Sequence, residues 1–214
     1  MKYLGERERG SDYGAMAPSY GSGGSMISFT EVFIVVVVVF MLVMYIRQHY
    51  GEVEIVRAKT DGRRYIVRKL ADRQEAAELL ARINVKLLRL VRHMVARFPR
   101  DAGVGRLHAN FNPEALSEGG TEVGYTSYSV NKGEKIVMCL RQQSDAFVDE
   151  NVLVYVAVHE LGHLMTDEVG HTPAFWDNFK RLAAEAIDIG VYVKVDFQND
   201  PKPYCGISIS SSVV

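Results

Sequence analysis

The longest apolar stretch of the chain covers residues 27–46. From Val32 to Ile46, every side chain is apolar except for the hydroxyl of Tyr45. A helix of about 20 apolar residues spans the hydrocarbon core of a bilayer, so we predict a transmembrane helix over this range. A signal peptide fits less well, because the sequence that ends at Arg47 has no small-residue cleavage site.

The sequence differs in character on the two sides of this stretch. Residues 1–26 are rich in Gly and Ser and poor in apolar residues, which is typical of a disordered tail. Residues 47–214 are enough for one domain of ordinary size, and 48% hydrophobic with 24% charged residues is a globular composition. We therefore expect a tail over 1–26, a transmembrane helix over 27–46 and a folded domain over 47–214.

Short segments rich in β-branched and aromatic residues predict two β-hairpins in this domain. The first pairs residues 52–58 with 63–70 through a turn that contains Asp-Gly, a dipeptide that favours hairpin turns. The second pairs residues 125–130 with 135–140. One strand of this second hairpin is our candidate for binding an extended substrate through backbone hydrogen bonds, although a purely structural hairpin is equally compatible with the sequence.

Helical periodicity marks residues 72–98, where apolar residues recur every three to four positions. Asp72 and Glu75 resemble a capping box at the start of this helix. The outer face of this helix is basic. It could bind anionic lipid headgroups or could simply be exposed to solvent. Nucleic-acid binding is not expected, because the sequence has no RNA-binding or zinc-finger signature. The basic face carries Arg82, Lys86, Arg89, Arg92 and Arg97.

Residues 101–120 are expected to form a loop and residues 191–197 a final strand.

A later helix carries the candidate chemistry. His159, Glu160 and His163 have the HExxH spacing, and residues four apart on a helix lie one above the other, so both imidazoles can reach one metal ion. Apolar residues surround the three on nearly all sides, which predicts a buried helix that begins near Asp149 or Glu150. Burying two imidazoles and a carboxylate is costly without a partner, and a metal cation supplies one.

Zinc held by two imidazoles is incomplete, because catalytic zinc has three protein ligands and one open position. His171 is the favoured third ligand. Gly170 allows a tight turn before it, and Thr172-Pro173 after it predicts the start of a helix over residues 173–189. Glu185, on that helix, is the alternative. The remaining candidates in the sequence are Asp167, Glu168 and Asp177.

The stretch HELGHLMTDEVGHTPAFW resembles the HExxH and HxxxFW signature of the WLM and SprT-like zinc metallopeptidases, a branch of the minimal zincins. The similarity extends over residues 52–210 and includes metallopeptidases of large DNA viruses and protists. It implies an α+β zincin-like domain with a small mixed sheet, an active-site helix and packing helices. It also implies zinc ligands at His159, His163 and His171, a general base at Glu160, and packing beneath the site by Phe175 and Trp176.

Charge and cysteine content bear on localisation. Residues 47–100 carry 14 Lys/Arg against 6 Asp/Glu, whereas residues 101–214 carry 8 against 16. The basic excess after the transmembrane helix places the domain in the cytosol by the positive-inside rule; in a virion membrane the topology would have to be restated. Two cysteines, Cys139 and Cys205, are too few for a disulfide framework, which favours reducing surroundings, although a single bridge is compatible with the sequence.

These observations predict a single-pass, membrane-anchored zinc endopeptidase that hydrolyses protein or peptide substrates, with viral capsid or inner-membrane proteins as candidate partners. Glu160 acts as the general base toward a zinc-activated water. The candidate donors to the oxyanion are Tyr204, Tyr125 and Tyr128, and the candidate acceptors that orient the imidazoles are Asp149, Asp167 and Asp177.

A structural role is the alternative from another class. A non-catalytic membrane or virion protein with a zincin-like fold would close its zinc site with a fourth ligand, for which Cys139 or Cys205 could serve. Glu160 argues against this role, since a structural site has no use for a base. Cleavage of DNA-crosslinked proteins, a role of WLM and SprT-like relatives, fits less well with a membrane anchor and an acidic catalytic half.

Overall fold

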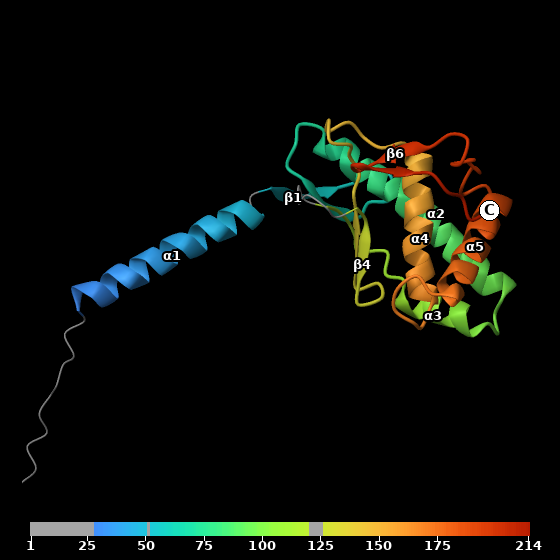
Figure 1. Ribbon diagram of the computed structural model, residues 1–214, viewed down its shortest axis with the longest axis horizontal. Helices are drawn as coiled ribbons and strands as arrows, with labels where there is room; N and C mark the ends of the chain where they lie inside the picture. The colour runs from blue at the N-terminus through green and yellow to red at the C-terminus, as the bar shows by residue number, and fades with distance from the viewer. Residues whose placement is uncertain (1–27, 51, 120–125) are drawn as a thin grey trace, which may run out of the picture. The chain divides into compact units, whose positions relative to one another are not determined.

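The computed structural model describes residues 28–50, 52–119 and 126–214. The tail predicted over residues 1–26 lies outside these ranges. The described residues form a mixed α and β structure with five helices and two small sheets (Figure 1). The general α+β prediction is therefore confirmed.

Helix α1, Phe29–Tyr50, confirms the long apolar helix expected from the sequence. The chain divides into two compact units, residues 1–44 and 45–214, and most of α1 belongs to the first. Its segment Phe29–Arg47 has a mean hydropathy of 2.7. By length and composition, this helix could cross a membrane.

The first turn of α1 is held by a reciprocal capping box. The N–H of Ser28 donates to Oε2 of Glu31 at 2.8 Å, and the N–H of Glu31 donates to Oγ of Ser28 at 3.2 Å. Such a pair satisfies two of the backbone donors that a helix start leaves unpaired. The one acid in the apolar stretch therefore has a local role at the helix end.

Five strands of the second unit form one mixed sheet. They are β1 (Val53–Arg57), β2 (Arg64–Arg68), β3 (Leu116–Glu118), β4 (Tyr128–Val130) and β5 (Lys135–Met138), arranged in the order β1-β2-β3-β5-β4. The pairs β1–β2 and β4–β5 are antiparallel, which confirms the two predicted hairpins, whereas β3 runs parallel to β2 and β5. Among the described strands, β1 and β4 are the edges of this sheet.

Four helices accompany the sheet: α2 (Arg73–Arg97), α3 (Ala102–Asn110), α4 (Glu150–Met165) and α5 (Pro173–Asp188). The sequence predicted α2, α4 and α5. The loop predicted over residues 101–120 is wrong, because α3 and β3 both lie in it. The glycines of AGVGRLHAN mask the helix in the sequence, yet Asp101 caps it by accepting a hydrogen bond from the N–H of Val104 at 2.9 Å.

The final strand predicted over residues 191–197 is also wrong. This segment is irregular, and the N–H groups of Val191 and Tyr192 both donate to the carbonyl of Ala186, at 2.8 and 3.1 Å. Val191, Tyr192 and Phe197 are buried in the core, whereas Val193 is exposed. A small hairpin that the sequence reading missed follows, formed by β6 (Lys202–Tyr204) and β7 (Ile207–Ile209).

A disulfide joins Cys139, directly after β5, to Cys205 in the turn between β6 and β7. Their Cα atoms are 6.3 Å apart, and 66 positions separate them in the sequence. The bond ties the small hairpin to the main sheet. It also removes the argument for reducing surroundings that was drawn from the cysteine count, because a persistent disulfide favours oxidising surroundings.

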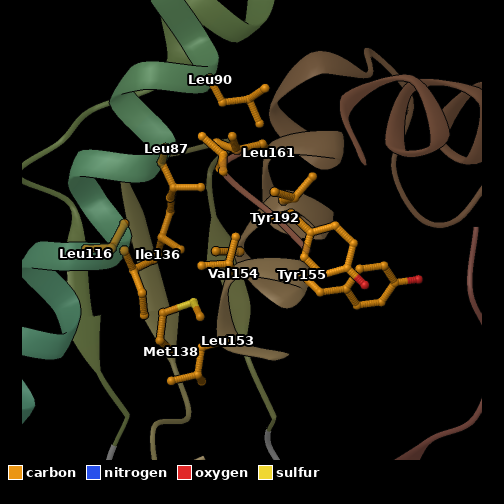
Figure 2. Close-up of a cluster of buried hydrophobic side chains, with 14 of the residues drawn as sticks. Leu87, Leu90, Leu116, Ile136, Met138, Leu153, Val154, Tyr155, Leu161 and Tyr192 are labelled. Carbon is orange, nitrogen blue, oxygen red and sulfur yellow. The ribbon is translucent and has the colours of Figure 1, made fainter. Parts of the chain in front are cut away.

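The hydrophobic core lies between the sheet and the helices. Figure 2 shows Leu87 and Leu90 of α2 facing Leu161 of α4. Beneath them, Leu116, Ile136 and Met138 of the sheet lie close to Val154 of the same helix. Helix α4 contributes buried residues from nearly every side, including Leu153, Tyr155, Ala157, Val158 and Leu164. The prediction of a buried helix is therefore confirmed.

One buried arginine links three parts of this domain. Nε of Arg141 donates to Oε1 of Glu118 at 2.7 Å, and its two terminal nitrogens donate to the carboxylate of Asp72 at 2.7 and 2.9 Å. Glu118 also accepts from the N–H of Arg68 at 2.7 Å. The predicted capping box at Asp72 is wrong, because its side chain makes no cap hydrogen bond and instead pairs with Arg141.

The basic face of α2 is partly neutralised within the fold. Arg82 and Lys86 each lie 2.8 Å from the carboxylate of Glu150 on α4, and Arg97 lies 3.2 Å from Glu185 on α5. These acids come from distant parts of the sequence. Three of the five basic residues therefore support helix packing, which leaves little for a dedicated lipid or nucleic-acid surface.

We expect replacement of Arg141 by Met to lower the free energy of unfolding of this domain by about 3–5 kcal/mol, because Glu118 would stay buried without its counter-charge. Chemical denaturation of the full chain in detergent measures this loss. Adding Glu118→Gln should recover part of it, since the amide carries no charge. The exposed Arg92 is the matched control, and Arg92→Met should change stability by less than about 0.5 kcal/mol. Equal effects of the two arginine variants would contradict the expectation.

Candidate metal centre

Three histidines converge at one end of α4. Their ligand nitrogens all lie within 4.8 Å of one another, and Nε2 of His159 is 3.0 Å from Nε2 of His171. His159 and His163 are one helical turn apart on α4, whereas His171 comes from the segment between α4 and α5. The convergence that the sequence predicted for these three side chains is therefore present.

The segment that carries His171 leaves α4 from a heavily capped end. A helix leaves its last carbonyls without intrahelical partners, and here side chains from α3 and from the turn between β4 and β5 supply them. Arg106 and Asn110 of α3 donate to the carbonyls of Met165 and Leu164, at 3.1 and 3.2 Å. Lys132, from the turn between β4 and β5, donates to the carbonyl of Thr166 at 3.0 Å and also to that of Asp167. These bonds fix the direction in which the chain turns toward His171.

The start of α5 is held just as firmly. Thr172 caps it, with Oγ1 accepting from the N–H of Phe175 at 3.3 Å, and Pro173 occupies the first helical position. Both features were predicted. His171 is therefore fixed between a capped helix end and a capped helix start.

Helix α5 approaches α4 closely beneath the histidines. A Cβ on Gly162 would lie 3.0 Å from Cε2 of Phe175 and 3.4 Å from Cβ of Phe179, so glycine is what allows this approach. The buried ring of Phe175 stacks on His163, with the centroids 4.3 Å apart. Phe175 thus packs beneath the site as the resemblance implied, whereas Trp176 is 45% exposed and lies at the rim.

Burial keeps two of the imidazoles neutral. Desolvation, and then the other histidines, lower the pKa of His159 to about 3. Desolvation also lowers the pKa of His163 to about 4, with smaller contributions from His171 and Lys132. Neutral imidazole is the form that binds a metal ion. The site therefore presents ligands that are already deprotonated at neutral pH.

Glu160 lies between these histidines and the edge strand β4. It is 4% exposed, and desolvation raises its pKa to about 7, although hydrogen bonds from the side chain and the backbone of Ser129 favour the charged form. A carboxylate with a pKa near neutrality can both accept and return a proton. Ser129 was not identified from the sequence, because only the pairing of β4 beside α4 brings it to Glu160.

A groove opens over these residues. Its volume is about 430 Å³, and strand β4 forms one of its sides. The opposite side comes from the segment between α4 and α5, with Glu168, Val169 and Gly170. His159, Glu160, His163 and His171 all line it. A metal ion held by the histidines would therefore be reachable by an extended ligand.

The candidate oxyanion donors lie in different surroundings. Tyr204 is buried near the site, where its hydroxyl shares a hydrogen bond with Oγ of Ser127, and desolvation raises its pKa above the ordinary value. Its phenol is therefore protonated at neutral pH and able to donate. Tyr128 lines the groove on β4, and Tyr125 lies outside the described residues.

The alternative third ligand is elsewhere in the fold. Oε2 of Glu185 is 2.6 Å from Nε2 of His93, and Arg97 pairs with the same carboxylate. Asp149, proposed to orient an imidazole, instead caps the start of α4 by accepting from the N–H groups of Asn151 and Val152, at 2.9 and 3.2 Å.

The fourth ligand of a purely structural zinc site also has no support. Cys139 and Cys205 are joined in the disulfide, so neither sulfur is a thiolate that could ligate a metal ion. The donor set at the histidine cluster fits zinc with an open position instead. It offers three imidazole nitrogen donors that lie within 4.8 Å of one another, and the groove lies beside them.

Comparison with known proteins finds one domain family and several viral relatives. The WLM domain family matches residues 64–207. An uncharacterized protein of Acanthamoeba polyphaga mimivirus is 27% identical over 186 residues, which cover 85% of this chain and 94% of that protein. Uncharacterized proteins of two invertebrate iridescent viruses, types 6 and 3, are 32% identical over 84 residues and 36% identical over 67 residues, covering 38% and 30% of this chain and 47% and 38% of their own lengths. No solved structure matches.

We expect the metal-free protein to lose thermal stability as the pH falls from 7 to 4. Unfolding lets His159 and His163 take up protons at their ordinary pKa of 6.5, whereas the folded chain resists protonation down to about 3 and 4. Their stabilising contribution is therefore complete above pH 6.5 and is lost progressively as the pH falls toward 4. The raised pKa of Glu160 favours the folded state over the same range and offsets part of this loss, but one glutamate does not outweigh two histidines. Calorimetry of a chelator-treated sample measures this loss. His163→Gln should make the fall shallower, and His108→Gln, at an exposed position on α3, should leave it unchanged.

Proposed function

This chain belongs to the WLM domain family, and from that membership and the arrangement of its histidines we propose that it is a membrane-anchored, zinc-dependent endopeptidase with a zincin-like fold. The family supports a protease-like function. One observation supports the assignment of zinc and a catalytic base: three imidazoles converge beside a buried carboxylate in an open groove. The mixed sheet, with an antiparallel edge strand next to this groove, supports the proposal.

In this proposal His159, His163 and His171 hold the zinc ion. Zinc, when bound, supplies a Lewis acid that activates water and polarises the peptide carbonyl. Glu160 takes the proton from the attacking water and passes it to the departing amine. Ser129 orients the Glu160 carboxylate through its two hydrogen bonds. Tyr204 donates its phenolic proton as a hydrogen bond to the developing oxyanion.

The substrate is a protein or peptide in extended conformation. Strand β4 lies at the edge of the sheet and lines the groove. A substrate strand laid along this edge would add to the sheet through backbone hydrogen bonds. The peptide bond to be cleaved would then pass over Glu160 and the histidines.

The anchor is helix α1, which has the length and composition to cross a membrane. The basic excess that follows it supports a cytosolic orientation of the domain by the positive-inside rule, whereas the Cys139–Cys205 disulfide favours the oxidising side of the membrane. Because the relatives are proteins of large DNA viruses, a virion membrane with capsid or inner-membrane partners is the second setting that we propose.

We expect Glu160→Gln to reduce hydrolysis by at least about 100-fold, the usual contribution of a general base, while zinc content stays unchanged. Peptide-library cleavage with and without a chelator, together with metal analysis, measures both quantities. Glu168→Gln is the matched control, since it changes an exposed glutamate at the mouth of the same groove. Full activity in the Glu160 variant would rule out the proposed base.

We expect His171→Ala to weaken zinc binding by at least about 100-fold, more than the loss of a residue that only supports a ligand. Competition with a chromophoric chelator measures the affinity. Glu185→Ala removes the alternative ligand and should leave zinc affinity unchanged, because Glu185 pairs with His93 and Arg97. If Glu185→Ala weakened zinc binding more than His171→Ala did, Glu185 would be the third ligand.

A further inference from the structure

A second cavity lies beside the histidines, and we propose that it is a specificity pocket whose outer wall is formed by residues 207–214. The pocket would take a large, uncharged apolar side chain next to the scissile bond. This inference rests on the proposed peptidase function and identifies the class of substrate on which that function acts.

The cavity has a volume of about 210 Å³. That is several times the roughly 30 Å³ occupied by one water molecule, so a Leu, Met or Phe side chain fits. His159 and Glu160 line it, so the cavity adjoins the proposed reacting groups. Tyr155, Val156 and Phe179 line it from the two helices, and Ile207, Ile209 and Val213 line it from the other side.

The wall is held in place by bonds along its length. The disulfide fixes Cys205 directly before it. Tyr155 donates to the carbonyl of Ser211 at 3.4 Å. Ser212 donates to the carbonyl of Val195 at 2.8 Å and accepts from the N–H of Phe197 at 3.1 Å. Val213 packs against the core beyond these bonds. The segment is therefore anchored at both ends of the pocket.

The chemistry of the lining selects apolar side chains. Among the described lining residues, Glu160 is the one acid and there is no Lys or Arg. Glu160 is engaged by Ser129 and by the proposed proton transfer. A charged substrate side chain would lose its hydration without gaining a partner, which is costly, whereas an apolar side chain gains from burial.

Much of this wall lies outside the region that the family shares. The WLM domain match ends at residue 207, whereas Ile209, Ser211 and Val213 of the lining follow it. The histidines, which lie inside the matched range, would thus fix the chemistry, and the segment that follows this range would help to select the residue that flanks the cleaved bond.

Ile207 offers a direct test, because it lines the pocket and is 53% exposed, so a charged replacement is tolerated there. The ligands are peptide hydroxamates, which anchor on zinc, with a benzyl, isobutyl, aminobutyl or carboxymethyl side chain beside the anchor. Calorimetry on the zinc-loaded full chain in detergent measures their affinities. Wild type should bind the benzyl and isobutyl ligands at least about tenfold more tightly than the charged ones.

Ile207→Asp should erase this preference and favour the aminobutyl ligand, and Ile207→Lys should favour the carboxymethyl ligand. Ile55→Asp is the matched control, since Ile55 is 67% exposed on β1 and does not line the pocket; it should bind as wild type does. Equal profiles for Ile207→Asp and Ile55→Asp, or no apolar preference in wild type, would overturn the pocket. Apolar preference in a wild-type protein that cleaves no peptide would support the pocket and refute the peptidase proposal.

Discussion

The arrangement of the domain depends on the burial of one helix that carries two imidazoles and a carboxylate. Helix α4 is covered by apolar contacts on nearly every side, so these polar groups lose water and must find partners in the protein or in a bound ion. His159 and His163 respond by staying neutral, and Glu160 by gaining two hydrogen bonds from Ser129. Burial therefore creates both the donors that a metal ion needs and the raised pKa that a base needs.

The elements around α4 cap and pack against the end of this helix that carries the histidines. Helix α3 and the turn between β4 and β5 supply the side chains that cap its last carbonyls. The same turn brings β4 alongside Glu160, and Gly162 lets α5 approach until Phe175 stacks under His163. Rigidity at this end matters, because His171 comes from an irregular segment and keeps its position only through the two capped helices beside it.

The sequence was informative where one physical requirement acts locally. The three histidines, Thr172-Pro173 and both hairpins follow from spacing, capping and turn preferences within a few residues, and the structure places them accordingly. It was uninformative where the partner is distant. Asp72 looked like a helix cap because Arg141, its partner 69 positions away, cannot be seen locally. Likewise, Ser129 gains its role only when β4 pairs at the edge of the sheet, and the two glycines of α3 conceal a helix that tertiary contacts stabilise.

Predicting a charged surface from the sequence has the same limit, because the partners of the charged residues are distant in the chain. Along the chain the basic and acidic residues separate into two halves, which indicates a basic surface, but folding brings the halves together. Arg82 and Lys86 meet Glu150, and Arg97 meets Glu185. The basic face of α2 is thereby used for holding α4 and α5, the two helices that flank the histidines. Arg63 and Arg68, in the segment after the apolar helix, also pair with acids of the other half, Glu114 and Asp145, so much of the basic excess seen along the sequence is neutralised within the fold.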